Sequence, residues 1–269
     1  MELKKRAAQL RLHALRMVHQ ANASHIGGCL SMADILAVLF GKILKLDPQN
    51  VNWPERDRLI ISKGHAAAIY YAALAEAGFF PVSWLGTYGQ NDSQLAGHIT
   101  KHGVPGVEFS AGSLGHGLSV ACGMAMGLKH DKNPARVFTI ISDGEMDEGS
   151  IWEAMLFAPQ HKLDNLSVIL DYNKIQSFGS VKEVLDLEPL ADKWKACRWA
   201  VREINGHDLG EIEKVLSQTP FEKNKPSVII AHTVKGKGVS YMENQLKWHY
   251  SAPDEKLYAQ AVKEIEATL

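Results

Sequence analysis

Four acidic side chains lie within six positions, directly behind an apolar run. The segment SDGEMDEGS, residues 142–150, contains Asp143, Glu145, Asp147 and Glu148, and it follows the run RVFTII. Because like charges this close repel one another, the cluster indicates either a solvated turn or a site beside a cation. Which of the two applies depends on what the fold brings to the same place.

A second polar group follows the next apolar run. If the runs 136–142 and 165–172 form neighbouring parallel strands, Asp143 and Asn173 converge at their carboxyl ends. A carboxylate and a carboxamide oxygen, completed by phosphate oxygens, suit Mg²⁺. Gly144 would let a phosphate approach the amides at the start of the following helix. The alternative is an acidic turn in which Asp143 caps that helix, and the residues alone leave both interpretations open.

Four of the twelve histidines lie in glycine-rich or irregular segments: His25 in SHIGG, His65 in KGHAA, His98 in AGHIT and His249 in KWHYS. Catalytic groups collect on such loops of parallel sheets. A neutral imidazole can donate to a sugar hydroxyl or carbonyl, and its pKa lies near working pH. For a single histidine the competing interpretation is a surface or core role, and we expect such a role for His13, His19, His130, His161 and His207.

Two glycine-rich segments could also contact phosphate. GSLGHG at 112–117 lacks the Lys-Ser/Thr ending of a nucleotide P-loop and follows no clear strand, so nucleotide binding there is not favoured. KGKG at 235–238 could grip a phosphate, but a lone run of four is more often a flexible basic loop. We expect Glu145 and Asp147 to be ordinary turn residues, and Cys122 to lie in the core.

These side chains need a scaffold, and the hydrophobic pattern predicts one. Apolar runs alternate with helical patterns, which favours an α/β fold with a doubly wound, mostly parallel sheet flanked by helices. The expected strands are 57–62, 136–142, 165–172, 199–204 and 226–232. The expected helices are 2–22, 31–44 with Ser31 as N-cap, 64–78, 114–130, 149–161, 188–197, 209–218 and 253–268. Residues 79–112 are expected to form a long functional loop, and 1–269 a single domain.

Composition narrows the class of protein further. The formal net charge of -1 favours neither nucleic acid nor an anionic membrane as partner. No run approaches the ~18 apolar residues of a membrane span. The three cysteines form no CxxC motif, which is typical of reduced thiols in a cytoplasmic protein.

Longer motifs match one enzyme family. SDGEMDEGSIWEA followed by ILDYNKIQSFG resembles the GDG…N signature of thiamine diphosphate enzymes, and it is most similar to the transketolase family. The match continues through SHIGGCLSMADIL, DRLIISKGHAAAIYYA, LAGHI, SAGSLGHGLSVACGMA, EINGHD and HTVKGKGVSYMEN…WHYSAPDEK. The resemblance implies the thiamine diphosphate-binding fold of a diphosphate-binding (PP) domain, and the N-terminal subunit of a split transketolase.

The resemblance also implies which residues bind the cofactor and its metal ion. Mg²⁺, or Ca²⁺ or Mn²⁺ in its place, would be bound by Asp143, Asn173 and the carbonyl of Ile175. Thiamine diphosphate would be contacted by His65, Gly112, Ser113, Leu114, Gly144, Asn173 and His249. Ser142 and Tyr172 depart from the family pattern, and we expect them to affect cofactor affinity rather than the fold.

Catalytic roles follow from the same resemblance. His25, His98 and His249 would line the channel of the donor ketose and assist proton transfer. Glu148 and Glu153 would form a polar path between two active sites. The implied reaction transfers a two-carbon ketol unit from a ketose or sugar phosphate to an aldose.

In this family a second, pyrimidine-binding domain supplies the glutamate that contacts the cofactor's aminopyrimidine ring, and this chain is expected to lack it. The resemblance therefore implies a partner subunit that carries the pyrimidine-binding and C-terminal domains, in a two-plus-two heterotetramer. Two alternatives stay open. One is a subunit similar to 1-deoxyxylulose-5-phosphate synthase or to a 2-oxoacid dehydrogenase E1. The other is a non-catalytic assembly subunit.

Overall fold

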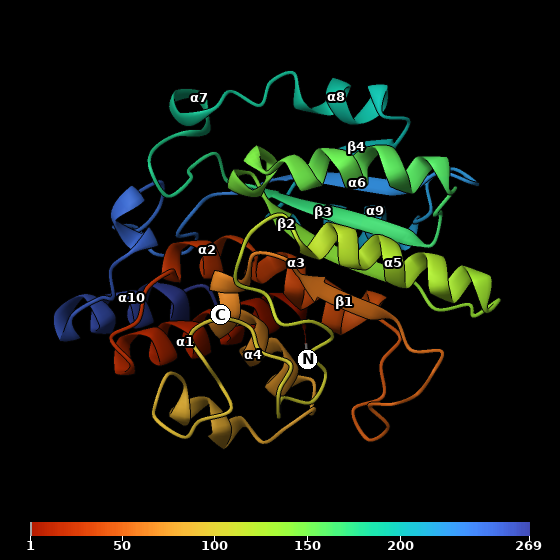
Figure 1. Ribbon diagram of the computed structural model, residues 1–269. Coiled ribbons are helices and arrows are strands. Elements are labelled where there is room, and N and C mark those ends of the chain that lie inside the picture. Colours follow the sequence, from red (N-terminus) through yellow and green to blue (C-terminus); the bar gives the residue numbers. More distant parts are fainter. Residues whose placement is uncertain (1) are drawn as a thin grey trace.

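Five parallel strands form one sheet in the order β1-β2-β3-β5-β4 (Figure 1). The computed structural model describes residues 2–269. The strands are β1 Arg58–Ile61, β2 Val137–Ser142, β3 Leu166–Tyr172, β4 Ala200–Asn205 and β5 Ser227–His232. Each lies within one residue of its predicted bounds, because Val- and Ile-rich runs suit strands that are buried on both faces. The predicted α/β fold is confirmed.

Helices connect the strands. The α-helices are α1 Leu3–Gln20, α2 Ile26–Ser31, α3 Ala33–Val38, α4 Ala67–Glu76, α5 Gly117–His130, α6 Gly149–Gln160, α7 Val181–Val184, α8 Leu190–Ala196, α9 Leu209–Ser217 and α10 Glu255–Glu266. Short 3-10 turns are Gly64–Ala66, Val82–Thr87, Gly144–Asp147 and Leu246–His249. Between residues 2 and 269, no helix combines the length and the apolar character that crossing a bilayer requires.

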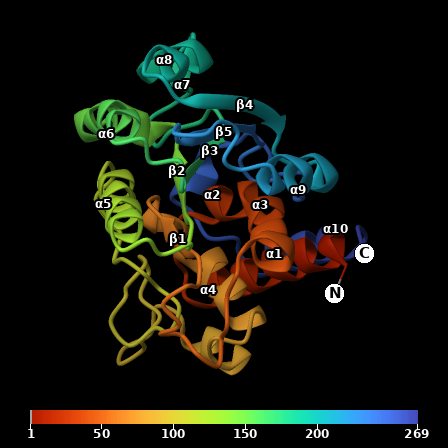
Figure 2. The ribbon, with the colours of Figure 1, turned by 90° about the vertical axis from the view of Figure 1, so that its right-hand side faces the viewer.

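The helices pack on both faces of the sheet (Figure 2). One face, with Phe138 and Ile140, is covered by α1, α3, α4 and α9. The other, with Ile141 and Val168, is covered by α5, α6 and α8. Because the helices that follow β1 and β2 lie on opposite faces, the chain leaves a crevice at the carboxyl ends of these strands, which is where such sheets bind ligands.

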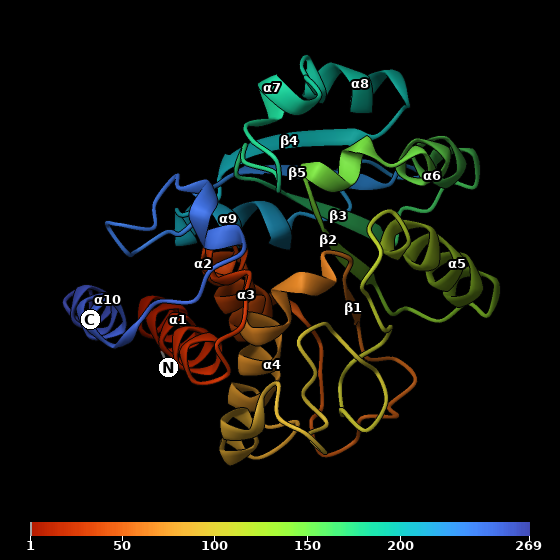
Figure 3. The same ribbon diagram turned by 60° about the vertical axis from the view of Figure 1, so that its left-hand side comes forward.

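The two ends of the described chain lie on one side of the molecule (Figure 3). α10 packs beside α1, where the ring of Tyr258 stacks on His19 with a centroid distance of 4.2 Å. Residues of both terminal helices belong to the core on the face of the sheet that carries Phe138.

The helix predicted over 31–44 is wrong at its start. Helix α2 begins at Ile26, the helical path is interrupted at Met32, and a π turn at Leu39–Ile43 follows α3. Ser31 is not an N-cap: it ends α2, and its buried hydroxyl donates to Asp171 Oδ2 at 2.6 Å. The need to pair a buried carboxylate decides the position of this serine, and it overrides the local capping signal.

A buried ion pair joins the segments beneath the crevice. Lys63, just past β1, donates from Nζ to Oδ2 of Asp171 on β3 and to the carbonyl of Gly28 at 2.9 Å. Thr233, just past β5, donates to Asp171 Oδ1, and Ser31 donates to Oδ2. Burial alone would raise the pKa of Asp171, but Lys63 and the two hydroxyls hold it below its usual value. One carboxylate therefore ties α2, β1, β3 and β5 together.

Replacing one member of this pair should destabilise the fold strongly. Lys63→Met is expected to lower the free energy of unfolding by about 3–5 kcal/mol, because the Asp171 carboxylate stays buried without its cation. Urea denaturation followed by circular dichroism measures the change. Lys195→Met, which breaks the exposed Lys195–Asp192 pair at 3.1 Å, is the matched control and should cost at most about 1 kcal/mol. Equal losses in both variants would contradict the expectation.

Candidate active site at the carboxyl edge of the sheet

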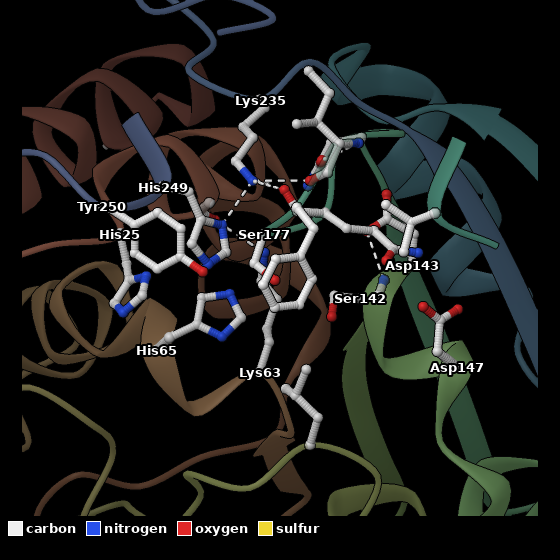
Figure 4. A pocket seen from close by; sticks show the side chains of 18 of the residues that line it. His25, Lys63, His65, Ser142, Asp143, Asp147, Ser177, Lys235, His249 and Tyr250 are labelled. Atoms are coloured by element: carbon white, nitrogen blue, oxygen red, sulfur yellow. Dashed lines mark hydrogen bonds between the residues drawn. The ribbon is translucent and has the colours of Figure 1, made fainter. Parts of the chain in front are cut away.

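A cavity of about 440 Å³ opens at the carboxyl ends of the strands (Figure 4). One end is formed by polar groups that follow β2 and β3, and the other by histidines from irregular segments. Lys63 and Lys235 also line it. The predicted site residues that line this cavity are His25, His65, His98, Leu114, Asp143, Gly144, Glu148, Asn173, Ile175 and His249.

Asp143 and Asn173 converge as predicted, because β2 and β3 are adjacent parallel strands. Asp143 is only 2% exposed. Its Oδ1 accepts from the N–H of Gly144 at 2.8 Å, and its Oδ2 accepts from the N–H of Lys174 at 2.6 Å. Burial, reinforced by the Asp171 carboxylate, raises the pKa of Asp143 to about 6. Asp143 thus caps the turn after β2 and also presents a buried carboxylate to the cavity.

The oxygen atoms at this end of the cavity suit a divalent cation that also takes ligands from a bound molecule, such as phosphate oxygens. Asn173 Oδ1 accepts from the N–H of Ile175 at 3.2 Å, which fixes the orientation of the carboxamide. Across residues 2–269, no three His, Cys, Asp or Glu side chains group into a complete metal site. A carboxylate, a carboxamide and a carbonyl are the few hard ligands with which Mg²⁺ is bound when phosphate oxygens complete its shell.

Lys235 is absent from the residues predicted from the sequence, and the flexible-loop interpretation of 235–238 is wrong. The Lys235 side chain is buried; its Nζ donates to the Ile175 carbonyl at 2.9 Å and lies 2.9 Å from His249 Nδ1. Burial lowers the pKa of Lys235 to about 8. It follows β5 by three positions, so the strand-end rule that selected Asp143 could also have selected Lys235.

Histidine rings gather at the other end of the cavity. The His25 ring centroid lies 5.1 Å from that of His65, 4.9 Å from His249 and 5.7 Å from His98. Burial, then the neighbouring His98 and Lys235, lowers the pKa of His25 to about 4. Burial and then Lys235 lower the pKa of His249 to about 3, and burial also lowers the pKa of His65. At neutral pH these three rings are uncharged and can donate or accept hydrogen bonds.

His25 has an unusual backbone conformation. Its φ of 75° lies in the left-handed region, which residues other than glycine seldom adopt. Its N–H donates to the carbonyl of His249 at 2.9 Å, while its Nδ1 is buried with no partner among residues 2–269. Nε2 of Gln176, beside Gly144, is also buried and unpaired within the described chain. Unpaired buried groups on a cavity wall indicate a ligand that supplies the missing partners.

Three predicted site residues do not line the cavity. Gly112 and Ser113 are exposed outside it, and only Leu114 of that group reaches it. Glu148 lies on its wall, whereas Glu153 borders a separate depression on α5 and α6. This chain therefore does not join Glu148 and Glu153 in one pocket.

Glu145 is not the ordinary turn residue expected from the sequence. It is fully buried, and it accepts hydrogen bonds from the hydroxyl of Ser62 and from the N–H of Gly115, the latter at 2.8 Å. Ser62 accepts in turn from the N–H of Gly117 at 2.9 Å. Glu145 thus fixes the turn that carries Leu114. Asp147 is exposed, as a turn residue would be, but it also lines the cavity.

Comparison with known proteins identifies the family. Residues 3–267 match the family model described as transketolase, thiamine diphosphate binding domain. The chain belongs to the transketolase family. The solved transketolase of Campylobacter jejuni superposes with a TM-score of 0.92 and 34% identity, over 99% of this chain and 43% of that one. This transketolase-family chain therefore spans less than half the length of the solved enzyme.

Relatives of matching length carry subunit names. The 6-deoxy-6-sulfo-D-fructose transketolase subunit SqwG of Clostridium sp. (strain MSTE9) is 42% identical over 98% of this chain and 96% of its own length. An apulose-4-phosphate transketolase subunit, from Phocaeicola vulgatus, is also 42% identical, over 95% of this chain and 90% of its own. Human transketolase is 37% identical over 98% of this chain, but only 42% of its own length is covered.

The contact between Lys235 and His249 predicts a measurable coupling. Lys235→Met should raise the pKa of His249, because it removes the ammonium that, after burial, most strongly disfavours the protonated ring. An NMR titration of the imidazole resonances in the cofactor-free chain measures the shift. Lys247→Met, at an exposed position of the same segment, is the control and should leave the titration unchanged. An unaltered His249 in Lys235→Met would refute the coupling.

Proposed function

We propose that this chain is the diphosphate-binding subunit of a two-subunit transketolase, which transfers a two-carbon ketol unit from a ketose or ketose phosphate to an aldose. The observation that carries the proposal is a single cavity in which an oxygen-donor end meets a cluster of histidine rings. The similarity to named transketolase subunits over nearly the whole chain supports it. Residues 1–269 would act as one domain.

The oxygen-donor end would hold the cofactor's charged part. Asp143, Asn173 and the Ile175 carbonyl would bind Mg²⁺, or Ca²⁺ or Mn²⁺, against the diphosphate. Gly144 lines this end of the cavity, and the buried ammonium of Lys235 favours an anion there. Thiamine diphosphate, when bound, supplies the electron sink for breaking a carbon–carbon bond next to a carbonyl.

The histidine end would bind the donor sugar. Because His25 and His249 are uncharged at neutral pH, each can hold a ketose hydroxyl as donor or acceptor. His25 lies on the cavity wall, and as an uncharged imidazole it would take the proton from the C3 hydroxyl of the donor. His98 is exposed at the rim of the cavity, beside His25, and would contact the same sugar.

We infer that a partner subunit completes the enzyme in the cytoplasm, as a two-plus-two heterotetramer. The partner would carry the pyrimidine-binding and C-terminal domains, for which the additional length of human transketolase provides a precedent. Exposed apolar side chains on α5 and α6, namely Met126, Leu156 and Phe157, are consistent with a covered surface there. Glu148 and Glu153 would connect two active sites only across such an assembly.

Asp143→Ala is expected to weaken binding of thiamine diphosphate with Mg²⁺ by about 100-fold or more and to abolish ketol transfer, because the metal loses its only carboxylate ligand on this chain. Isothermal titration of the cofactor into the assembled enzyme measures the first effect. Asp192→Ala, at an exposed acid on α8 that does not line the cavity, should stay within about threefold of the wild type. Full activity in Asp143→Ala would instead support a non-catalytic role in assembly.

The choice of donor separates this proposal from the other thiamine diphosphate enzymes. The assembled pair should turn over xylulose 5-phosphate with an aldose acceptor and should not consume pyruvate, because a row of imidazoles suits hydroxyl groups rather than a bare 2-oxoacid. Coupled assays of the two donors at equal concentration measure the preference. Faster use of pyruvate would point to a subunit similar to 1-deoxyxylulose-5-phosphate synthase or to a 2-oxoacid dehydrogenase E1.

A further inference from the structure

Tyr250 presents an aromatic ring to the candidate active site from a firmly held backbone position. It follows the Leu246–His249 turn; its N–H donates to the carbonyl of Lys247 at 3.2 Å, and its carbonyl accepts from the hydroxyl of Ser24 at 3.1 Å. The preceding residue, His249, is bonded through its carbonyl to the N–H of His25. His25 and His249 are both proposed to bind the donor sugar. The hydrogen bonds that fix the backbone of Tyr250 therefore join the same two segments that carry these histidines.

The Tyr250 hydroxyl has no structural role within the described chain. It is 57% exposed, and its hydroxyl makes no hydrogen bond with any residue in the described part of the chain, 2–269. The hydroxyls of Tyr71 and Tyr88, in contrast, donate to backbone carbonyls at 3.1 and 3.3 Å. An exposed phenol whose hydroxyl has no protein partner contributes little to stability, so a use in binding is the better explanation.

The ring nevertheless lies within the histidine group. Its centroid is 4.7 Å from that of His249 and 6.2 Å from that of His25, and it is the one tyrosine on the cavity wall. Figure 4 shows its hydroxyl pointing toward the imidazoles of His65 and His249. His25, His65 and His249 are half-buried, whereas Tyr250 is exposed. Tyr250 therefore stands at the rim, outward of the rings that would surround the reacting carbons.

Position and chemistry together suggest what the phenol contacts. The two carbons that are transferred must reach the deep part of the cavity, so the remainder of the ketose extends toward the rim. An aromatic face packs well on the C–H groups of a sugar, and a phenol hydroxyl can donate to or accept from a sugar hydroxyl. A donor that has no hydroxyl-bearing carbons beyond the cleaved bond could contact neither the aromatic face nor the phenol hydroxyl.

We propose that Tyr250 is a specificity-determining residue that selects polyhydroxylated ketoses as donors, by hydrogen bonding a hydroxyl on the carbons beyond the cleaved bond. This inference rests on the proposed function. It predicts that Tyr250 acts on the binding of long donors and is of little consequence for the shortest one. The shortest is 3-hydroxypyruvate, whose C1–C2 bond breaks to release CO₂ and leave the same two-carbon unit.

The test compares two substitutions and two donors in the enzyme assembled with its partner. Tyr250→Phe, which keeps the ring and loses the hydroxyl, should raise KM for xylulose 5-phosphate about tenfold with kcat little changed. With 3-hydroxypyruvate, both constants should stay within about twofold of the wild type. Tyr250→Ala, which also loses the ring, should lower the ratio of kcat/KM for xylulose 5-phosphate over that for 3-hydroxypyruvate further, by about 30-fold.

Tyr258→Phe is the matched control, because the Tyr258 hydroxyl also lacks a partner within residues 2–269 while its ring stacks on His19, and neither residue lines the cavity. It should behave as wild type with both donors. Equal losses with the two donors in the Tyr250 variants, or no change with either, would overturn the inference. A wild-type enzyme that uses neither donor would instead overturn the proposed function, and this inference with it.

Discussion

The candidate site depends on one buried carboxylate. Asp171 lies at the end of the central strand β3 and is bonded to Lys63, Ser31 and Thr233, which come from three other segments. A charge so deeply buried is tolerated only when partners satisfy it, so these four segments must arrive together. Lys63 leads directly into His65, and Thr233 into Lys235. The hydrogen bonds of Asp171 at the floor of the crevice thus also position the candidate site residues His65 and Lys235.

A second buried network of hydrogen bonds holds the segment that follows β5. Asp34 on α3 accepts two hydrogen bonds from Arg11, at 3.1 and 2.5 Å, and lies 2.8 Å from Nδ1 of His207. His207 Nε2 then accepts from the N–H of Val234 at 2.8 Å, which confirms the structural role expected for this histidine. The residue after Val234 is Lys235. Both networks end on the chain that follows β5, so this irregular segment is held almost as firmly as a strand.

The sequence predicted the parts of the molecule that depend on local pattern. Strand bounds followed from apolar runs, and the convergence of Asp143 with Asn173 followed from the geometry of parallel strands. It did not predict the burial of Lys63, Glu145 or Lys235, because charged residues are on average exposed and their partners lie far along the chain. Lys63 and Asp171 are 108 positions apart. A long-range ion pair leaves no periodic signal, and only the folded arrangement reveals it.

Floor and rim of the cavity differ in what a substitution changes. At the floor, Asp171 and Lys63 carry stability and site geometry together, so little can vary there without loss of the fold. At the rim, His98, Phe178 and Tyr250 are exposed on irregular segments, and their replacement disturbs few contacts. A new side chain at the rim therefore alters what the cavity admits while the floor keeps the cofactor end intact. If Tyr250 selects the donor as proposed, the selectivity for the donor lies in the least buried residues of the cavity wall.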